Sequence, residues 1–156
     1  MECLLGTSNS IEKRVENLIK YKIDMLDEEV TFGKSTYDSE YLVKLHEFLY
    51  GNVYEWAGQI RNGITEKDIE EINNAIETLV ILSQCFVSDL YDEYLETIDY
   101  LKYMQMFKDG NKRTIYAFVK QLICAYRMPL ELLPLCGYDD EVNLSEAGIK
   151  LKYGKK

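Results

Sequence analysis

The segment that decides the fold runs from residue 105 to residue 126 and reads QMFKDGNKRTIYAFVKQLICAY. Its first part, around Phe107 to Asn111, is polar and contains a glycine, which is typical of a loop. Its second part, from Ile115 to Tyr126, is strongly apolar, and Met128-Pro129 then stops a helix. The pattern predicts a loop that leads directly into a buried helix.

The rest of the chain also has helical spacing nearly throughout. Apolar residues recur three or four positions apart in four further segments, and a Ser, Asp or Thr stands where each of the first three would begin. These segments are Ser10 to Leu26, Asp38 or Ser39 to Gly51, Thr65 to Phe86, and Asp92 to Met104. Strand patterns are nearly absent, and no repeat or linker interrupts the chain. We therefore expect one all-α domain over residues 1–156, ending in a weakly helical tail.

The composition excludes several classes of protein. The chain has 156 residues, 18 Lys and Arg against 27 Asp and Glu, and a net charge of −9. This acidic balance argues against nucleic-acid binding, which relies on basic side chains to neutralise phosphates. No segment approaches the roughly 18 apolar residues of a membrane span, and the N-terminus lacks the basic flank and apolar core of a signal peptide. We expect a cytoplasmic protein with neither a nucleic-acid nor a membrane partner.

Histidine and cysteine are too sparse for a metal cluster. The one histidine, His46, cannot form a multi-histidine site, and the cysteines at positions 3, 85, 124 and 136 include no Cys-x-x-Cys pair. Cys85 and Cys124 have apolar neighbours, so we interpret them as free, buried thiols in a reducing compartment. Zinc binding and a redox dithiol are both disfavoured.

The loop itself has the features of an anion site. A helix N-terminus presents unpaired N–H groups and a partial positive charge. Gly110 allows a ligand to approach the backbone, and Lys112 and Arg113 add two cations. Asp109 could hold Mg²⁺ together with substrate phosphates. The competing interpretation is a capped helix with a solvated cluster of charges, and the spacing alone does not separate the two.

Two blocks of sequence resemble the Fic/Doc (Fido) family. Residues 105–114 are similar to the family signature His-x-Phe-x-Asp/Glu-Gly-Asn-Gly/Lys-Arg. Residues 45–61, which contain Tyr-Glu-Trp-Ala-Gly-Gln-Ile-Arg, resemble the helix and turn that precede this signature in the family. The blocks lie in the expected order, and the resemblance covers roughly residues 40–127. It implies a Fic/Doc-like helical bundle with, in this chain, at most a short β-hairpin flap.

The family chemistry implied by the resemblance is transfer of AMP, or of phosphate, from ATP to a hydroxyl group of a target protein. Carried over by position, Asp109 would bind Mg²⁺, and Phe107 would anchor the loop in the core. The residues that would hold the nucleotide phosphates are Gly110, Asn111, Lys112 and Arg113.

The chain departs from the family pattern in the loop and before it. Gln105 stands where the family has its catalytic His, and losing a general base typically costs about 10²–10⁴-fold in rate. Tyr116 stands where the extended motif ends in Arg, so a γ-phosphate contact is missing, and Lys112 in place of Gly is closer to the Doc branch. Only a few residues separate Ile60 from Thr65, which shortens the flap that docks a target. We expect transfer to be weakened or lost.

Two classes of function stay open. The chain is either a weakened transferase or a pseudoenzyme, a toxin–antitoxin-type binding module that keeps the fold and acts through a protein partner. The family's inhibitory pattern Ser/Thr-x-x-x-Glu-Gly/Asn is absent, since Glu12 occupies the hydroxyl position before Glu16-Asn17. An antitoxin-like inhibitor would therefore come from another chain. His46 lies outside the motif and is interpreted as a structural histidine, and Trp56 with Tyr54 as core anchors.

Overall fold

The structure is a computed structural model that describes residues 8–26 and 37–129. Within these two ranges the chain forms five α-helices, one short 3-10 helix and no strand. The prediction of an all-α fold is confirmed. The elements are α1 (Ser8–Met25), α2 (Ser39–Tyr50), α3 (Glu66–Gln84), η1 (Ser88–Leu90), α4 (Tyr91–Met104) and α5 (Asn111–Ala125).

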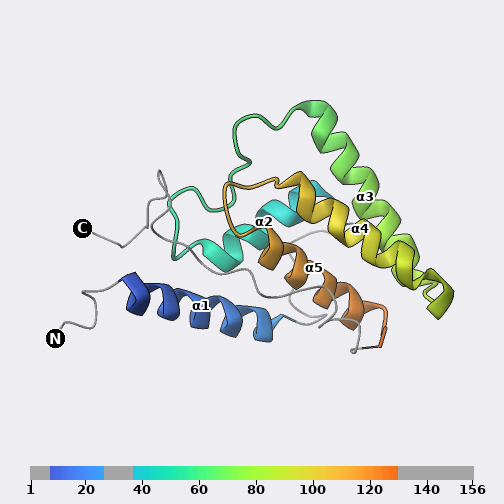
Figure 1. Ribbon diagram of the computed structural model, residues 1–156, viewed down its shortest axis with the longest axis horizontal. Coiled ribbons are helices and arrows are strands. Elements are labelled where there is room, and N and C mark those ends of the chain that lie inside the picture. The colour runs from blue at the N-terminus through green and yellow to red at the C-terminus, as the bar shows by residue number, and fades with distance from the viewer. Residues whose placement is uncertain (1–7, 27–36, 130–156) are drawn as a thin grey trace.

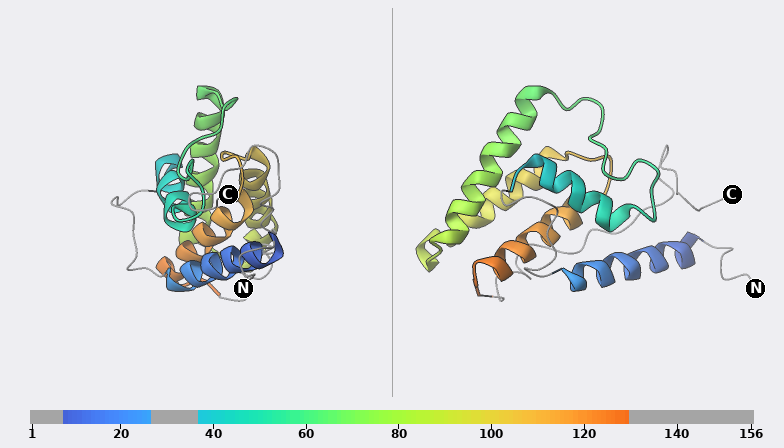
Figure 2. Two further views of the ribbon diagram at one scale, coloured as in Figure 1. Left: turned by 90° about the vertical axis from the view of Figure 1, so that its left-hand side faces the viewer. Right: turned by 180° about the vertical axis from the view of Figure 1, so that it is seen from behind.

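The helix α5 forms the centre of the bundle. α2, α3 and α4 all contact it, and α1 packs against α2 on the outside (Figure 1). α3 and α4 run side by side in opposite directions, joined through η1, and make the most extensive helix pair. Figure 2 shows α1 and α3 on opposite sides of the bundle. This arrangement buries α5 on most of its surface.

The sequence of α5 explains its central position. Nine of its fifteen residues are buried, including Phe118 and Leu122, as expected for a helix that is apolar on most sides. A buried polar side chain needs a partner, and the Tyr41 hydroxyl on α2 donates a hydrogen bond to Gln121 Oε1 at 2.6 Å. The contact between α2 and α5 is therefore both apolar and hydrogen-bonded.

The start of α5 lies four residues before the predicted one. The helix begins at Asn111 rather than Ile115, because Gly110 precedes it in the left-handed conformation at φ 80°. The first residues of the helix are polar, so the spacing of apolar residues does not reveal its first turn. The consequence is functional, since Lys112 and Arg113 stand in the first helical turn.

The other helix starts follow local capping chemistry. Asp38 accepts a hydrogen bond from the Tyr41 N–H at 3.0 Å, which confirms the predicted start of α2. Thr65 and Asp68 form a reciprocal capping box at the start of α3, as predicted from Thr65. α1 begins at Ser8, two residues before the predicted Ser10.

The connection between α2 and α3 contains turns and no strand. It covers residues 51–65, and α3 follows at once. This agrees with the expectation of at most a short flap in this chain. The predicted C-terminal tail lies outside the described residues.

The prediction of buried cysteines is wrong for Cys85. Both Cys85 and Cys124 are free thiols, but Cys85 is exposed and Cys124 is half-buried. Cys85 caps the C-terminus of α3, where the helix turns toward η1 and leaves the core. Cys3 and Cys136 lie outside the described residues. Among the described helices, none is both long and apolar enough to cross a membrane.

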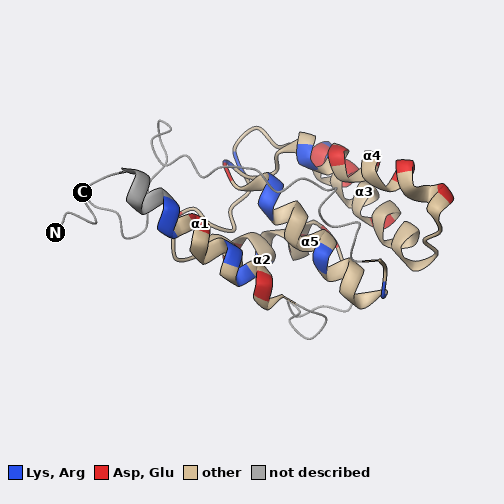
Figure 3. Ribbon diagram, turned by 60° about the horizontal axis from the view of Figure 1, so that its bottom comes forward, with Lys and Arg blue, Asp and Glu red and all other residues tan. Residues whose placement is uncertain are grey.

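The negative charge is concentrated on the α3–α4 pair. Residues 66–104 carry ten Asp and Glu against two Lys, which gives this segment a net charge of −8. The whole chain has a net charge of −9. Figure 3 shows acidic residues along α3 and α4, with basic residues on α1 and α5. The acidic segment from Asp89 to Asp99 is solvent-exposed at each of its Asp and Glu residues, so it forms a solvated helix face.

Candidate active site

The predicted loop, residues 105–110, connects α4 to α5 at one end of the bundle (Figure 1). It lies against α2 and the turns that follow α2, because His46, Tyr54 and Arg61 all make hydrogen bonds to it. The two sequence blocks that carry the family resemblance therefore meet in space. The loop packs against the block at residues 45–61 and is hydrogen-bonded to it.

The first residue of the loop is held by Arg61. Gln105 adopts a left-handed backbone conformation at φ 49° and caps α4. The Arg61 guanidinium donates through Nε to the Gln105 carbonyl and through Nη2 to the Met104 carbonyl, and the Arg61 N–H donates to the Met106 carbonyl at 3.0 Å. These bonds satisfy carbonyl groups that a helix C-terminus leaves unpaired. The backbone at position 105 is fixed, whereas its side chain is exposed.

The middle of the loop is closed by Asn111. Its Oδ1 accepts a hydrogen bond from the Phe107 N–H at 2.8 Å, and its Nδ2 donates to the Phe107 carbonyl at 2.7 Å. Phe107 itself is only 2 % exposed, as the resemblance implied for the anchor of the loop. The Asn111 amide is thus engaged in the structure of the loop.

The buried His46 joins the loop to the turn after α2. The Gly58 N–H donates to His46 Nδ1 at 2.9 Å, so the ring proton resides on Nε2, which donates to the Asp109 carbonyl at 2.9 Å. Burial lowers the pKa of His46 to about 4, and the hydrogen bond to Asp109 offsets only part of this effect. Both ring nitrogens are engaged and the ring is neutral, which supports the interpretation of His46 as a structural histidine.

A cluster of aromatic side chains packs against the loop. The His46 ring stacks on Phe107 with centroids 4.0 Å apart, and Trp56 stacks on Tyr54 at 4.3 Å. Tyr54 also stacks on Tyr50 at 5.4 Å. Lys108 of the loop lies over the Trp56 ring at 5.5 Å, within the range of a cation–π contact. Tyr54 is fully buried and Trp56 is half-buried, in line with their interpretation as core anchors.

Gly110 faces this cluster and has no space for a side chain. A Cβ atom at this position would lie 2.5 Å from two atoms of the Tyr50 ring. Together with the positive φ, this contact requires glycine at the start of α5. The side of Gly110 that a Cβ would occupy therefore packs against protein.

The carboxylate of Asp109 is oriented by Tyr54. The Tyr54 hydroxyl donates to Asp109 Oδ2 at 2.9 Å. Burial and the neighbouring negative charge of Asp109 raise the pKa of Tyr54, while the positive charge of Arg113 lowers it. Arg113 is 5 % exposed, so a buried guanidinium, a hydroxyl and a carboxylate lie within electrostatic reach of one another. Tyr54 remains protonated and acts as a donor.

The first turn of α5 offers backbone donors beside this carboxylate. No side chain caps the helix, so the N–H groups of Asn111 and Lys112 could bind an anionic ligand. Lys112 is exposed there. Within residues 8–26 and 37–129, no group of three or more His, Cys, Asp or Glu side chains could form a metal cage. The donor set therefore fits Mg²⁺ only if phosphates share it, which is the usual mode for this ion.

A pocket of about 300 Å³ opens beside position 105. Its lining residues come from α3, α4 and the turn before α3, and they are Arg61, Ile64, Asp68, Tyr103, Met104 and Gln105. Tyr103 is 79 % exposed and stands at the rim. The pocket places the Gln105 side chain next to an accessible hollow, where a substrate group could approach it.

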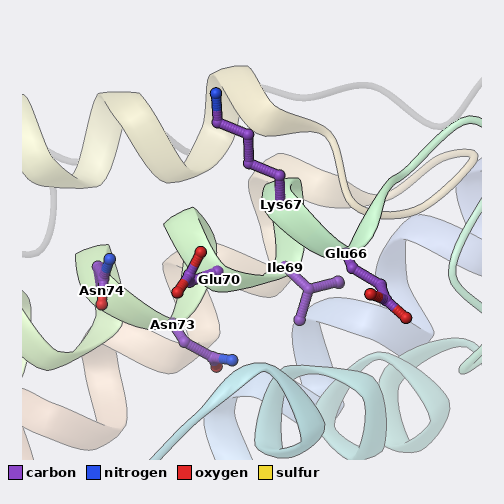
Figure 4. A pocket seen from close by; sticks show the side chains of 6 residues that line it. All are labelled: Glu66, Lys67, Ile69, Glu70, Asn73 and Asn74. Atoms are coloured by element: carbon purple, nitrogen blue, oxygen red, sulfur yellow. The ribbon is translucent and has the colours of Figure 1, made fainter.

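A second hollow, of about 540 Å³, lies on α3 and is lined by Glu66, Lys67, Ile69, Glu70, Asn73 and Asn74. Ile69 and Asn73 point toward α2, whereas Lys67 points the opposite way (Figure 4). The Asn73 amide accepts a hydrogen bond from the Ser39 N–H at 2.7 Å. This hollow is open and polar and includes no residue of the loop, so it belongs to the helix surface.

The structure brings most of the predicted site residues together. Asp109 and the start of α5 are adjacent, and Gln105 lies at the other end of the same short loop. Sequence reasoning missed the contacts that hold this loop. His46, Tyr54 and Arg61 bond to it from 44 to 63 residues away, and only their shared location in the second sequence block pointed to them.

Comparison with known proteins gives one relative and no family. No protein-family model matches the chain. Protein adenylyltransferase VbhT from Bartonella schoenbuchensis is 26 % identical to the chain over 133 residues. The chain is similar to a protein adenylyltransferase. The match covers 76 % of this chain but 28 % of VbhT, so the chain spans little more than a quarter of the length of that relative.

Proposed function

We propose that this chain is a single Fic-like domain that binds ATP with Mg²⁺ at residues 109–113 and transfers AMP to a hydroxyl group of a target protein. Its similarity to a protein adenylyltransferase supports this proposal. The resemblance of residues 45–61 and 105–114 to the Fic/Doc family points to the same reaction. The transfer would be weak in the chain as it stands, because Gln105 occupies the position of the general base.

The observation that carries the proposal is the position of Asp109 beside an uncapped helix start. The first N–H groups of α5, with Lys112 and Arg113, would bind the phosphates of the nucleotide. Asp109, held by Tyr54, would contribute a carboxylate oxygen to Mg²⁺. When bound, Mg²⁺ neutralises negative charge on the phosphates. The hydrogen bonds from His46 and Tyr54 would hold Asp109 in position for this role.

The side chain at position 105 decides how fast transfer proceeds. In the reaction, the hydroxyl oxygen of the target bonds to the α-phosphorus, the bond from that phosphorus to the β-phosphate breaks, and pyrophosphate leaves with the electron pair. The hydroxyl proton then needs an acceptor. Gln105 can orient the hydroxyl by hydrogen bonding, but a neutral amide is not a base. Transfer of phosphate would use the γ-phosphorus instead, and Lys112 in place of Gly keeps that version open.

A second candidate function is binding without catalysis. The absence of a base at position 105 favours it, and so does the short connection of residues 51–65, in which the structure shows turns and no strand that could pair with a target. In this version the chain keeps nucleotide binding and acts through a protein partner, such as an antitoxin-like inhibitor.

Restoring the base tests the first function. Histidine is enriched among residues with positive φ, and the Gln105 side chain is exposed, so Gln105→His fits the observed backbone. The unmodified chain and this variant are incubated in cell lysate with Mg²⁺ and ATP labelled at the α- or γ-phosphate. We expect the variant to label a protein with the α-phosphate at least about 100-fold faster than the unmodified chain.

The matched control combines Gln105→His with Asp109→Ala and is expected to be silent. Label from the γ-phosphate would instead assign phosphoryl transfer. A Gln105→His variant that transfers no label, while ATP still raises the melting temperature, would favour the binding module.

A further inference from the structure

The hydrogen bond between Tyr54 and Asp109 links a fully buried aromatic residue to the proposed metal ligand. The hydroxyl lies 2.9 Å from Asp109 Oδ2, and Tyr54 is 1 % exposed. The two residues are 55 positions apart in the chain, so the contact is not a by-product of local backbone geometry. It exists only because the turn after α2 packs against the loop.

Two aromatic side chains stack on the Tyr54 ring. Tyr50 stacks on it with an interplanar angle of 14°, and Trp56 stacks on it with an angle of 10°. A fully buried ring that stacks on two nearly parallel rings cannot tilt without losing packing contacts. Its hydroxyl is therefore a donor in a fixed position, and the Asp109 carboxylate has to rotate to accept the hydrogen bond.

Asp109 is fixed at a second point. Its backbone carbonyl accepts the hydrogen bond from His46 Nε2 at 2.9 Å. Tyr54 then sets the rotation of the carboxylate by engaging Oδ2, and Oδ1 makes no hydrogen bond to the described part of the chain. A half-buried carboxylate without these contacts would sample several rotamers and would lose that freedom on binding a ligand.

We propose that Tyr54 is a positioning residue that orients the Asp109 carboxylate so that one oxygen, Oδ1, is presented to Mg²⁺ bound with nucleotide phosphates. This inference rests on the proposed function, because it assumes that Asp109 meets the metal. Residues that hydrogen-bond to a metal ligand commonly change metal affinity by 10–100-fold when removed. Tyr54 would act in this way without touching metal or nucleotide.

The test is Tyr54→Phe, which removes only the hydroxyl and keeps the ring in its stack. ATP affinity of the full chain is measured by calorimetry in EDTA and over a series of Mg²⁺ concentrations. We expect the Mg²⁺ concentration that gives half of the full gain in ATP affinity to rise about 10-fold, with ATP affinity in EDTA unchanged.

The matched control is Tyr41→Phe. It also removes a buried hydroxyl with a hydrogen bond, here to Gln121 at 2.6 Å, but this bond joins the start of α2 to the second half of α5 and includes no residue of the loop. Both variants are expected to lose a similar amount of thermal stability, and only Tyr54→Phe should change the Mg²⁺ dependence. Circular dichroism confirms that both keep their helices.

A double substitution separates an effect through Asp109 from an effect on the fold. Asp109→Ala should abolish the gain in ATP affinity with Mg²⁺, and adding Tyr54→Phe should then change nothing further. A Mg²⁺ dependence equal in Tyr54→Phe and Tyr41→Phe would overturn the inference while the proposed function stands. An unmodified chain that does not bind ATP would overturn the proposed function, and the inference with it.

Discussion

The Nε2 atom of His46 lies 2.9 Å from the carbonyl oxygen of Asp109 and donates its proton to it. This bond joins α2 to a loop 63 residues further along the chain. The other ring nitrogen accepts from Gly58, so the one histidine of the protein connects three segments. The bond from Gly58 depends on the neutral ring, because Nδ1 cannot accept once it is protonated, whereas the Nε2 bond to Asp109 does not. Burial also disfavours the charged ring, which makes the fold sensitive to acid at this side chain.

Acid should therefore destabilise the protein through His46. Its pKa of about 4 in the fold lies below the usual 6.5, so the unfolded chain takes up a proton first and stability falls as the pH drops from 6.5 toward 4. We expect a loss of about 2 kcal/mol in unfolding free energy between pH 7 and pH 5. The His46→Gln variant is compared with the unmodified chain by urea unfolding at pH 7 and pH 5. It should be less stable at pH 7, and its unfolding free energy should fall less between the two pH values. An equal fall in both proteins would contradict this account.

Gly110→Ala should weaken the start of α5. Its Cβ would meet the Tyr50 ring at 2.5 Å, and the positive φ adds strain, so we expect a loss of about 2–4 kcal/mol. Gly63→Ala is the matched control, because its φ of 99° is also unfavourable but its Cβ would meet only Arg61 Nη1, at 3.3 Å. That variant should lose about 1 kcal/mol. The melting temperatures of the two variants report the difference, and similar values would argue against the contact with Tyr50.

Asn111→Ala should open the loop. The substitution removes both hydrogen bonds to Phe107, which leaves a half-buried backbone donor and acceptor without their partner, at a cost of about 2–3 kcal/mol. Asn74→Ala on the exposed face of α3 serves as the control and should change stability by less than about 0.5 kcal/mol. Urea unfolding of both variants measures the effect. If Asn111→Ala behaved like the control, the two bonds would contribute nothing to the fold.

Arg61→Lys should loosen the junction between α4 and the loop. The planar guanidinium reaches the carbonyls of Met104 and Gln105 at once, which a single ammonium group cannot do in the same geometry. Amide hydrogen exchange of the peptide covering residues 101–107 should accelerate several-fold, while that of α1 stays unchanged. Unchanged protection at residues 101–107 would show that Arg61 does not hold the loop.

Local chemistry in the sequence predicted much of the fold. Asp38 and Thr65 were recognisable as caps because a capping residue acts within three positions of itself. The start of α5 was missed, since the apolar pattern begins at Ile115 while the helix begins where Gly110 turns the chain. Cys85 was expected to be buried from its apolar neighbours, but its place at the end of α3 exposes it.

The site was predictable only in part. Asp109 and the start of α5 were identifiable because they are contiguous. The bonds from His46 and Tyr54 were not, because they cross 63 and 55 residues and depend on how α2 packs against the loop. Asn111 was assigned to phosphate by the resemblance, while the structure shows its amide bonded to Phe107. No property of the residue type could reveal that partner in advance.

The measurement that tests the central claim most directly is the amide NMR spectrum of the unmodified chain during titration with ATP and Mg²⁺. If the start of α5 is a nucleotide site, the largest shifts should occur at residues 110–113, and Asp109→Ala should weaken the Mg²⁺-dependent part. An unchanged spectrum, or shifts centred on the α3 hollow at Glu66 and Asn73, would contradict the account.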